Sequence, residues 1–426
     1  MNEEKEYTKR VSDELILLQL ESAGIVLIEG AKWCGKTTSA MQYAGSVVFM
    51  DDPNHMDDYM KLVENNIGLL LSGENPRLFD EWQKAPQLWD ACRFVVDRRN
   101  EEGLFILTGS AEPVNYDKIS HTGTGRVGWV KMRPMSLYES GESNGKVSLK
   151  NLFDGDFEAV ESNELNLEAL SFLICRGGWP KAMEKSERAA LRQAFNYVDA
   201  VAKREIVEVD EVNRSESNTR RLLRSYGRHQ GSQASIGTIA ADMMSNGSMP
   251  NEKTIISYIN ALRKIFVIED MEAWNPNLRS KAAIRTSPTR YFVDSSIATA
   301  SLGLGPRDLM KDLNTLGLLF ETMVVRDLRV YADAIDGSIF HYRDNNGLEC
   351  DSVVHLRNGH YGLVEIKLGG ETLIAEGAKN LHLLAKKIDT SKMPEPSFMM
   401  IVTGTGKYAY RRDDGILVVP IGCLKN

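Results

Sequence analysis

Short apolar runs recur along the first third of the chain, and each one ends in polar or glycine residues. They cover residues 25–29, 46–52, 77–81 and 103–110. Runs of this length and composition are typical of strands buried in a sheet. The stretch 38–44, between the first two runs, has the composition of a helix. This alternation predicts an α/β fold for the N-terminal part of the chain.

A glycine loop connects the first of these strands to the helix. It reads Gly30-Ala31-Lys32-Trp33-Cys34-Gly35-Lys36-Thr37 and fits the pattern G-x-x-x-x-G-K-[ST]. Strand, glycine loop and helix in this order predict a phosphate-binding loop. The glycines let backbone N–H groups turn toward phosphate oxygens, the lysine assists catalysis at the β- and γ-phosphates, and the threonine hydroxyl ligates Mg²⁺. We therefore expect ATP to be bound by Gly30, Ala31, Lys32, Trp33, Cys34, Gly35, Lys36, Thr37 and Thr38.

Acidic and polar residues at the ends of later strands complete a predicted hydrolysis site. Asp80 and Glu81 follow an apolar run behind the phosphate loop. In such sites the aspartate holds Mg²⁺ through its water shell, and the glutamate polarises the attacking water. The next strand offers Thr108, with Ser110 as second choice, as a catalytic side chain near the γ-phosphate. A cap at the strand end is the alternative interpretation of these hydroxyls.

One arginine is a candidate for action between subunits. Arg126 follows the small, flexible stretch 122–125 and precedes the apolar strand 127–132. An arginine in this place can reach the nucleotide of a neighbouring subunit as a catalytic finger, which predicts a homo-oligomer. A solvated loop arginine fits the same pattern equally well.

Composition narrows the class of protein. A length of 426 residues suggests two or three domains. A net charge of −8 excludes a polycation that coats DNA over its whole surface. The five scattered cysteines suit reduced thiols and lack the spacing of zinc ligands. No apolar run approaches the roughly 20 residues of a membrane span, and the polar N-terminus lacks a signal-peptide core, so we expect a cytoplasmic protein without a membrane partner.

The chain resembles the prokaryotic AAA-type ATPases that carry a C-terminal domain of unknown function. The resemblance rests on the phosphate loop, on Asp-Glu-Trp-Gln-Lys-Ala-Pro at 80–86, and on the stretches 105–110 and 125–137. The run 80–86 is the most distinctive of these motifs. The resemblance extends along the whole chain and implies an AAA-type ATPase domain that hydrolyses ATP with Mg²⁺.

The middle of the chain has the element order of a winged helix. Apolar periodicity predicts helices at 236–243 and 251–265, then strands at 266–270 and 291–294 around a basic loop. The loop contains Arg279, Lys281, Arg285 and Arg290, and an upstream cluster contains Arg220, Arg221, Arg224 and Arg228. These residues are candidates for contact with DNA phosphates. A winged helix that contacts only proteins, with arginines solvating a helix face, is the alternative.

The C-terminal part predicts a helix from residue 317 and then three strands at 339–343, 348–354 and 362–367. The pair Asn-Gly at 358–359 indicates a hairpin between the second and third strands. Side chains repeat every two residues along a strand, so Glu365 and Lys367 share a face. Asp351 on the neighbouring strand can face the same side.

These three residues suit metal-dependent chemistry. Carboxylates, a main-chain carbonyl and waters make an oxygen-rich Mg²⁺ site, and a lysine beside it can orient or deprotonate a bound water. We predict Asp351, Glu365 and Lys367 as catalytic, with Glu321 from the preceding helix as a further metal ligand. The pattern of Asp followed by Glu-x-Lys resembles the restriction-endonuclease-like nuclease fold, which implies cleavage of nucleic acid. An ion-pair network that stabilises the sheet would use the same residues.

The sequence therefore predicts three domains: an ATPase domain at 1–155, a helical region with a winged helix at 156–305, and a nuclease-like α/β domain at 306–426. The predicted function is hydrolysis of ATP coupled to an action of the C-terminal domain on DNA. The alternative is a nucleotide-dependent switch whose C-terminal domain docks protein or DNA without cleaving it.

Overall fold

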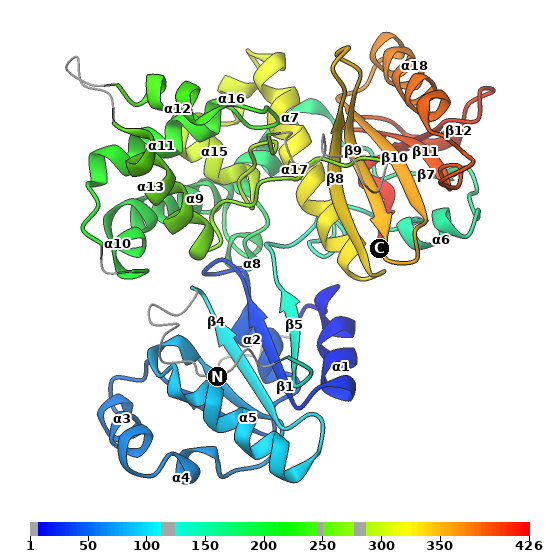
Figure 1. Ribbon diagram of the computed structural model, residues 1–426. Helices are drawn as coiled ribbons and strands as arrows, with labels where there is room; N and C mark the ends of the chain where they lie inside the picture. The colour runs from blue at the N-terminus through cyan, green and yellow to red at the C-terminus, as the bar shows by residue number, and fades with distance from the viewer. Residues whose placement is uncertain (1–6, 112–123, 211, 245–249, 277–286) are drawn as a thin grey trace. The chain divides into compact units, whose positions relative to one another are not determined.

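The structure is a computed structural model that describes residues 7–111, 124–210, 212–244, 250–276 and 287–426 (Figure 1). It divides into two compact units. The first unit comprises residues 1–133, 204–213 and 261–266, and the second comprises residues 134–203, 214–260 and 267–426. Each unit contains its own large sheet. The finer division into three domains stays a prediction.

The first unit is built on a parallel sheet of five strands in the order β2-β3-β4-β1-β5. The strands are β1 (Ile25–Glu29), β2 (Ser46–Phe49), β3 (Arg77–Asp80), β4 (Phe105–Gly109) and β5 (Val127–Lys131). Parallel strands covered on both faces carry continuous apolar runs, which explains the pattern seen in the sequence. The strand that carries Thr108, β4, lies between the loop strand β1 and the Asp80 strand β3.

Helices cover both faces of this sheet, because alternate side chains of β1 pack in two different helix-covered cores. The helices are α1 (Ser12–Ser22), α2 (Lys36–Met41), α3 (Met56–Asn65), α4 (Ile67–Leu71) and α5 (Gln87–Arg99). Ile25 and Leu27 pack in a core with α3, α4 and α5, whereas Val26 and Ile28 pack in a core with α1 and α2. Because all five strands run the same way, the loops that follow their carboxyl ends meet at one edge of the sheet.

The second unit contains a mixed sheet of seven strands in the order β7-β12-β13-β11-β10-β9-β8. The strands are β7 (Val160–Glu161), β8 (Gly337–Arg343), β9 (Glu349–Leu356), β10 (Tyr361–Lys367), β11 (Phe398–Thr403), β12 (Tyr408–Arg411) and β13 (Leu417–Pro420). Strands β8, β9 and β10 form an antiparallel meander, and β10, β11 and β13 are parallel. The predicted hairpin is confirmed: Gly359 in the turn between β9 and β10 has φ +90°, which glycine adopts without strain. Strand β6 (Val147–Ser148) pairs separately with β14 (Leu424–Lys425).

Two long helices accompany the meander, as Figure 1 shows. Helix α17 (Leu313–Asp333) precedes the meander and contacts β8, β9 and β10. Helix α18 (Glu371–Lys387) follows it, and its Ala378, Leu381 and Leu384 share an apolar core with side chains of β9 and β10. The mixed α/β class predicted from the sequence is therefore present in both units.

The middle of the chain is helical. Its helices are α6 (Leu149–Phe153), α7 (Leu167–Arg176), α8 (Pro180–Met183), α9 (Glu187–Ala200), α10 (Ile206–Glu208), α11 (Glu216–Arg228), α12 (Ile236–Asp242), α13 (Glu252–Lys264), α15 (Ser295–Leu302) and α16 (Pro306–Leu309). Among the described residues, no helix is long and apolar enough to cross a lipid bilayer.

The predicted winged-helix elements are found only in part. Both helices form, as α12 and α13, but in place of the strands the structure has two isolated antiparallel bridges, Ile268 with Phe292 and Met271 with Thr289. Three basic residues of the predicted wing, Arg279, Lys281 and Arg285, lie outside the described residues. The winged helix stays a prediction.

Arg290, the fourth basic residue of the predicted wing, corrects the interpretation of that loop. Its side chain is buried and forms an ion pair with Asp270 at 2.8 Å. A guanidinium neutralised in the interior cannot contact DNA phosphate, because its charge and its donors are already used inside the protein.

The upstream arginine cluster on α11 is divided between paired and free side chains. Arg220 forms ion pairs with Asp199 and Glu216, and Arg228 forms one with Asp242. The other two arginines of the cluster, Arg221 and Arg224, are exposed and have no carboxylate partner within the described part of the chain. Two of the four arginines of this cluster are therefore paired with carboxylates of the protein itself.

A buried ion-pair network anchors the start of the second unit. Arg326 on α17 forms ion pairs with Asp294 at 2.8 Å and with Asp327 at 2.7 Å, and the three side chains are almost fully buried. Asp294 also accepts a hydrogen bond from the Gly178 N–H, and Asp327 accepts one from the Leu137 N–H. Burial raises the pKa of Asp327 to about 6 despite the neighbouring guanidinium. Removing one member of such a network leaves an uncompensated charge in the interior.

Candidate functional site

The predicted phosphate loop leaves the carboxyl end of β1 and enters α2. Gly30 has φ +154° and Gly35 has φ +105°, conformations that side chains with a Cβ rarely adopt. A Cβ on Gly30 would lie 2.0 Å from the Met132 carbonyl oxygen, so only glycine fits where the loop passes the end of β5. The glycines of the motif are therefore required by the backbone path.

The other loop residues point in different directions. Ala31 and Cys34 are buried, and the Cys34 thiol lies 3.4 Å from the Met132 carbonyl oxygen. Trp33 and Thr38 are exposed. Lys32 forms an ion pair at 2.6 Å with Glu205, which belongs to the same unit. A loop with two buried apolar members and a fixed backbone presents its N–H groups in one arrangement.

Lys36, Thr37 and Asp80 meet at this edge of the sheet. The Lys36 ammonium donates to the Gly30 and Ala31 carbonyls, at 2.9 Å each, and so curls back over its own loop. The Thr37 hydroxyl donates to Asp80 Oδ1 at 2.7 Å. A hydroxyl and a carboxylate in contact, beside a loop that offers N–H groups, are the hard oxygen ligands that suit Mg²⁺. The residues present therefore fit the predicted metal, which would be held by Thr37 and Asp80.

Thr108 lies at this site but in another role than the one expected of it. Its hydroxyl donates to the same Asp80 oxygen that accepts from Thr37. Burial raises the pKa of Asp80, and the hydroxyls of Thr108 and Thr37 offset part of that rise because they stabilise the ionised form. In this structure Thr108 thus supports the predicted metal ligand; its predicted contact with the γ-phosphate stays a prediction.

Glu81 is held by two residues, Gln83 and Ser110, and the sequence predicts this contact for neither of them. The Gln83 side-chain amide and the Ser110 hydroxyl both donate to Glu81 Oε2, the latter at 3.0 Å. Glu81 itself has φ +55° and ψ +43°, a left-handed conformation. The feature of the sequence that points to Gln83 is its place in the distinctive run 80–86, because no other local pattern assigns it a role.

Arg126 lies at the far end of the sheet from the phosphate loop. Its carbonyl accepts a hydrogen bond from the Ile25 N–H, at the start of β1, whereas the loop follows the end of β1. Five residues of strand separate the two ends by about 16 Å. Its guanidinium forms an ion pair at 2.7 Å with Asp97 on α5 of the same chain. Arg126 is thus not placed at the nucleotide site of its own chain.

In the second unit, the structure brings Asp351, Glu365 and Lys367 together. The Lys367 ammonium lies 3.0 Å from Asp351 Oδ2 and 2.7 Å from Glu365 Oε2, so it bridges the two carboxylates. Asp351 also accepts from the Ile366 N–H at 2.7 Å. The predicted shared face of adjacent strands is confirmed by these contacts.

Glu321 belongs to the same neighbourhood. It accepts a hydrogen bond from the Tyr291 hydroxyl. Burial is the largest cause that raises the pKa of Glu321 to about 8, and the negative charge of Asp351 is the second. The same two causes raise the pKa of Glu365 to about 8. Burial opposes the charge on Lys367, yet Asp351 and Glu365 together raise its pKa.

The contacts within this charge cluster are those of an ion-pair network. Within the described ranges, no three side chains of the types His, Cys, Asp and Glu are arranged so that they could hold a metal ion. The ammonium of Lys367 lies within ion-pair distance of both carboxylates that were predicted as ligands. The arrangement matches the ion-pair network that was the alternative interpretation, and the metal role of Glu321, Asp351 and Glu365 stays a prediction.

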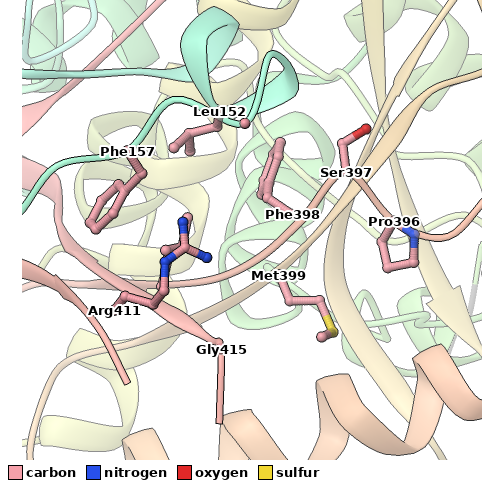
Figure 2. Close-up of a pocket in the computed structure, with 10 residues that line it drawn as sticks. Leu152, Phe157, Pro396, Ser397, Phe398, Met399, Arg411 and Gly415 are labelled. Carbon is pink, nitrogen blue, oxygen red and sulfur yellow. The ribbon is translucent and has the colours of Figure 1, made fainter. Parts of the chain in front are cut away.

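A separate pocket of about 170 Å³ lies in the second unit and includes none of the predicted site residues. Figure 2 shows its wall of Leu152, Phe157, Phe398 and Met399, with Arg411 beside Phe157. The Arg411 guanidinium lies 5.5 Å from the centre of the Phe157 ring. This is a small hollow lined by both polar and apolar surface, and its volume is well below the volume that usually encloses a drug-sized ligand.

Comparison with known families identifies the N-terminal part. Residues 22–141 match the model of a family described as "AAA domain". This part of the chain is similar to AAA-type P-loop ATPase domains. The match covers the phosphate loop, Asp80, Glu81, Thr108 and Arg126.

The regions beyond the AAA domain match families without known function. Residues 167–308 match "Domain of unknown function (DUF8612)" and residues 316–424 match "Domain of unknown function (DUF4143)". Uncharacterized proteins of Mycobacterium bovis and Mycobacterium tuberculosis are each 24% identical over 358 residues, which is 82% of this chain and 71% of theirs.

Two solved structures also resemble the chain at low sequence identity. The Walker-type ATPase of Pyrococcus abyssi is 14% identical with a TM-score of 0.43, over 70% of this chain and 99% of that one. A DNA replication initiation factor is 17% identical with a TM-score of 0.22, over 59% of this chain and 85% of that one.

Proposed function

We propose that the chain binds ATP with Mg²⁺ and hydrolyses it at the edge of the AAA sheet. The observation that supports this most directly is the contact of the Thr37 hydroxyl with Asp80, beside a glycine loop that Lys36 covers. The loop N–H groups and Lys36 bind the phosphates, Thr37 and Asp80 hold Mg²⁺, and Glu81 accepts the proton of the attacking water. Bound Mg²⁺ neutralises charge on the β- and γ-phosphates.

The test is ATP hydrolysis and nucleotide affinity in the full chain and in two variants. Lys36→Ala removes the ammonium over the loop and is expected to abolish measurable hydrolysis and weaken ATP binding. Glu81→Gln removes the base but keeps its size, and is expected to lower kcat by about 100-fold or more while ATP binding persists. Lys9→Ala, an exposed lysine of the same unit, is the control for loss of charge. Unchanged hydrolysis in both site variants would contradict the proposal.

We further propose that Arg126 acts in a neighbouring subunit. Because it lies a strand length away from its own loop, the proposed finger acts between copies of the chain. Arg126→Ala and Lys36→Ala, each inactive alone, are then expected to recover part of the activity when mixed, since a mixed pair contains one intact site. Failure to recover, with oligomers present by sedimentation, would leave Arg126 as the surface partner of Asp97.

For the C-terminal domain we propose two candidates in a stated order. The ion pairs of Lys367 with Asp351 and Glu365 favour the alternative function, a docking module that does not cleave and that ATP binding switches. Metal-dependent cleavage of DNA is the second candidate, supported by the gathering of these three residues on adjacent strands.

One experiment decides between the two candidates. The full chain would be incubated with plasmid and single-stranded DNA, with Mg²⁺ or Mn²⁺, and with or without ATP. If the domain only docks a partner, no DNA cleavage is expected. Calorimetry should then show no metal binding that is present in the wild-type chain and lost in Asp351→Ala. Cleavage that both Asp351→Ala and Lys367→Ala abolish, in folded variants, would establish the nuclease instead. Exposed Lys392 provides the control variant Lys392→Ala.

A further inference from the structure

The Glu81 side chain is placed by an unusual turn at the carboxyl end of β3. The backbone of Glu81 is left-handed, at φ +55° and ψ +43°, which is unfavourable for a residue with a Cβ. A 3-10 turn, Trp82–Lys84, follows directly. This reversal brings Gln83, only two residues later, back beside the Glu81 carboxylate. Strained backbone that a structure retains near a candidate catalytic group indicates a functional constraint.

The two donors to Glu81 both reach the same oxygen. Gln83 Nε2 and Ser110 Oγ donate to Oε2. Within the described part of the chain, Oε1 receives no hydrogen bond. A carboxylate is an acceptor only, so the amide of Gln83 must turn its NH₂ group toward Glu81. One oxygen is therefore fixed by the protein, and the other is left for a ligand.

The cost of this arrangement appears on the other side of the amide. With its NH₂ group on Glu81, the Gln83 Oε1 atom is buried and, among the described residues, has no hydrogen-bond partner. Leaving a buried acceptor unpaired is unfavourable, so stability alone does not explain the orientation. Gly109 at the end of β4 makes room for it, because a Cβ there would lie 3.1 Å from both Gln83 Oε1 and Trp82 Nε1.

We propose that Gln83 and Ser110 are positioning residues that fix the Glu81 carboxylate through Oε2 and leave Oε1 to accept the proton of the attacking water. This inference rests on the proposed ATP hydrolysis and adds to it the residues that orient the base. Two donors from different segments, the turn after β3 and the end of β4, hold the carboxylate at a fixed angle. Without them the carboxylate rotates, and fewer bound water molecules meet an aligned acceptor.

The test separates positioning from a structural effect. Single-turnover hydrolysis and ATP affinity are measured for Gln83→Ala and Ser110→Ala in the full chain. Each is expected to lower the hydrolysis rate about 10-fold and to leave ATP affinity within about 2-fold, since neither side chain touches the loop. Ser110→Thr keeps the hydroxyl and is expected to restore most of the rate. Gln42→Ala, an exposed glutamine on the same unit, is the control.

A double-mutant cycle with Glu81→Gln gives the decisive readout. If the two residues act through Glu81, adding Gln83→Ala or Ser110→Ala to Glu81→Gln lowers the rate no further. A drop of the same 10-fold in that background, or a loss of ATP affinity in place of rate, overturns the inference and leaves the proposed hydrolysis intact. A wild-type chain that does not hydrolyse ATP refutes both. If Gln83→Ala does not fold, the Ser110→Ala and Ser110→Thr pair decides, because both act on the same oxygen.

Discussion

The substitution Gly30→Ala tests how tightly the phosphate loop is fixed against the sheet. A Cβ at this position would lie 2.0 Å from the Met132 carbonyl oxygen and 3.0 Å from its carbon. The strand cannot retreat easily, because the Met132 N–H donates to the Glu29 carbonyl at 2.7 Å and β5 pairs with β1 along its length. The added methyl group therefore forces the loop itself to move.

The magnitude follows from two terms. A residue with a Cβ at φ +154° costs about 1–2 kcal/mol in backbone strain. Forcing an extra methyl group into packed main chain costs about 1–3 kcal/mol. We therefore expect Gly30→Ala to lower the free energy of unfolding by about 2–5 kcal/mol. The displaced N–H groups should also weaken ATP binding by about 10-fold or more, because they no longer converge on the phosphates.

Urea unfolding of the full chain, followed by tryptophan fluorescence, measures the first effect, and titration with a fluorescent ATP analogue measures the second. Four of the six tryptophans report on the first unit, namely Trp33, Trp82, Trp89 and Trp129. Gly125→Ala is the matched control: it has φ +78° but no atom within 4 Å of its Cβ, so it carries only the backbone term of about 1–2 kcal/mol. If Gly30→Ala destabilises no more than Gly125→Ala and binds ATP normally, the steric argument is wrong.

Three further predictions concern the second unit. Arg326→Leu leaves Asp294 buried without its cation and should destabilise the protein by about 3–5 kcal/mol in urea unfolding. Lys367→Ala leaves Glu365 in the same condition and should also cost about 3 kcal/mol, whether or not the cluster has a catalytic role. Burial lowers the pKa of His341 from 6.5 to about 4. Between pH 6.5 and pH 4, His341 is protonated in the unfolded chain but stays neutral in the folded chain. The free energy of unfolding therefore falls by up to about 3 kcal/mol as the pH falls from 6.5 to 4. His341→Gln should remove that loss.

Each of these predictions has a control on an exposed side chain. Arg343→Leu and Lys392→Ala break ion pairs at the surface and should change stability by less than about 1 kcal/mol. His360→Gln replaces an exposed histidine and is the control for the substitution itself. Effects of equal size in a control and its buried counterpart would show that burial does not set the energy.

Local sequence patterns were sufficient for the elements and for the ends of the strands in the first unit. Continuous apolar runs predicted the strands, and the residues after β1 and at the carboxyl ends of β3 and β4 gave the loop, Asp80 and Thr108. These predictions succeed because a parallel sheet places all carboxyl ends at one edge, so adjacency in space follows from position within each strand. The partners of those residues did not follow in the same way: the Thr108 hydroxyl was expected near phosphate and lies on Asp80.

The errors share a physical cause. The local sequence around Arg290 is that of an exposed basic loop. Only the packing of the folded chain shows that its side chain is buried beside Asp270. Strands 266–270 and 291–294 have a strand-like pattern, yet only isolated bridges form there. Charge and propensity are local properties, whereas burial and pairing depend on segments distant in sequence.

By itself, the sequence predicted a phosphate loop between a strand and a helix of an α/β fold, because glycine spacing and hydrophobic periodicity are local properties of the chain. It also determined that Asp351, Glu365 and Lys367 would share one face of two strands, since side chains alternate with a period of two. Only the tertiary structure decided that Lys367 bridges the two carboxylates and that Arg126 lies a strand length from its own loop. It also decided that Gln83 and Ser110 donate hydrogen bonds to one oxygen of Glu81. Those outcomes depend on distances between side chains on different elements, which no local pattern encodes.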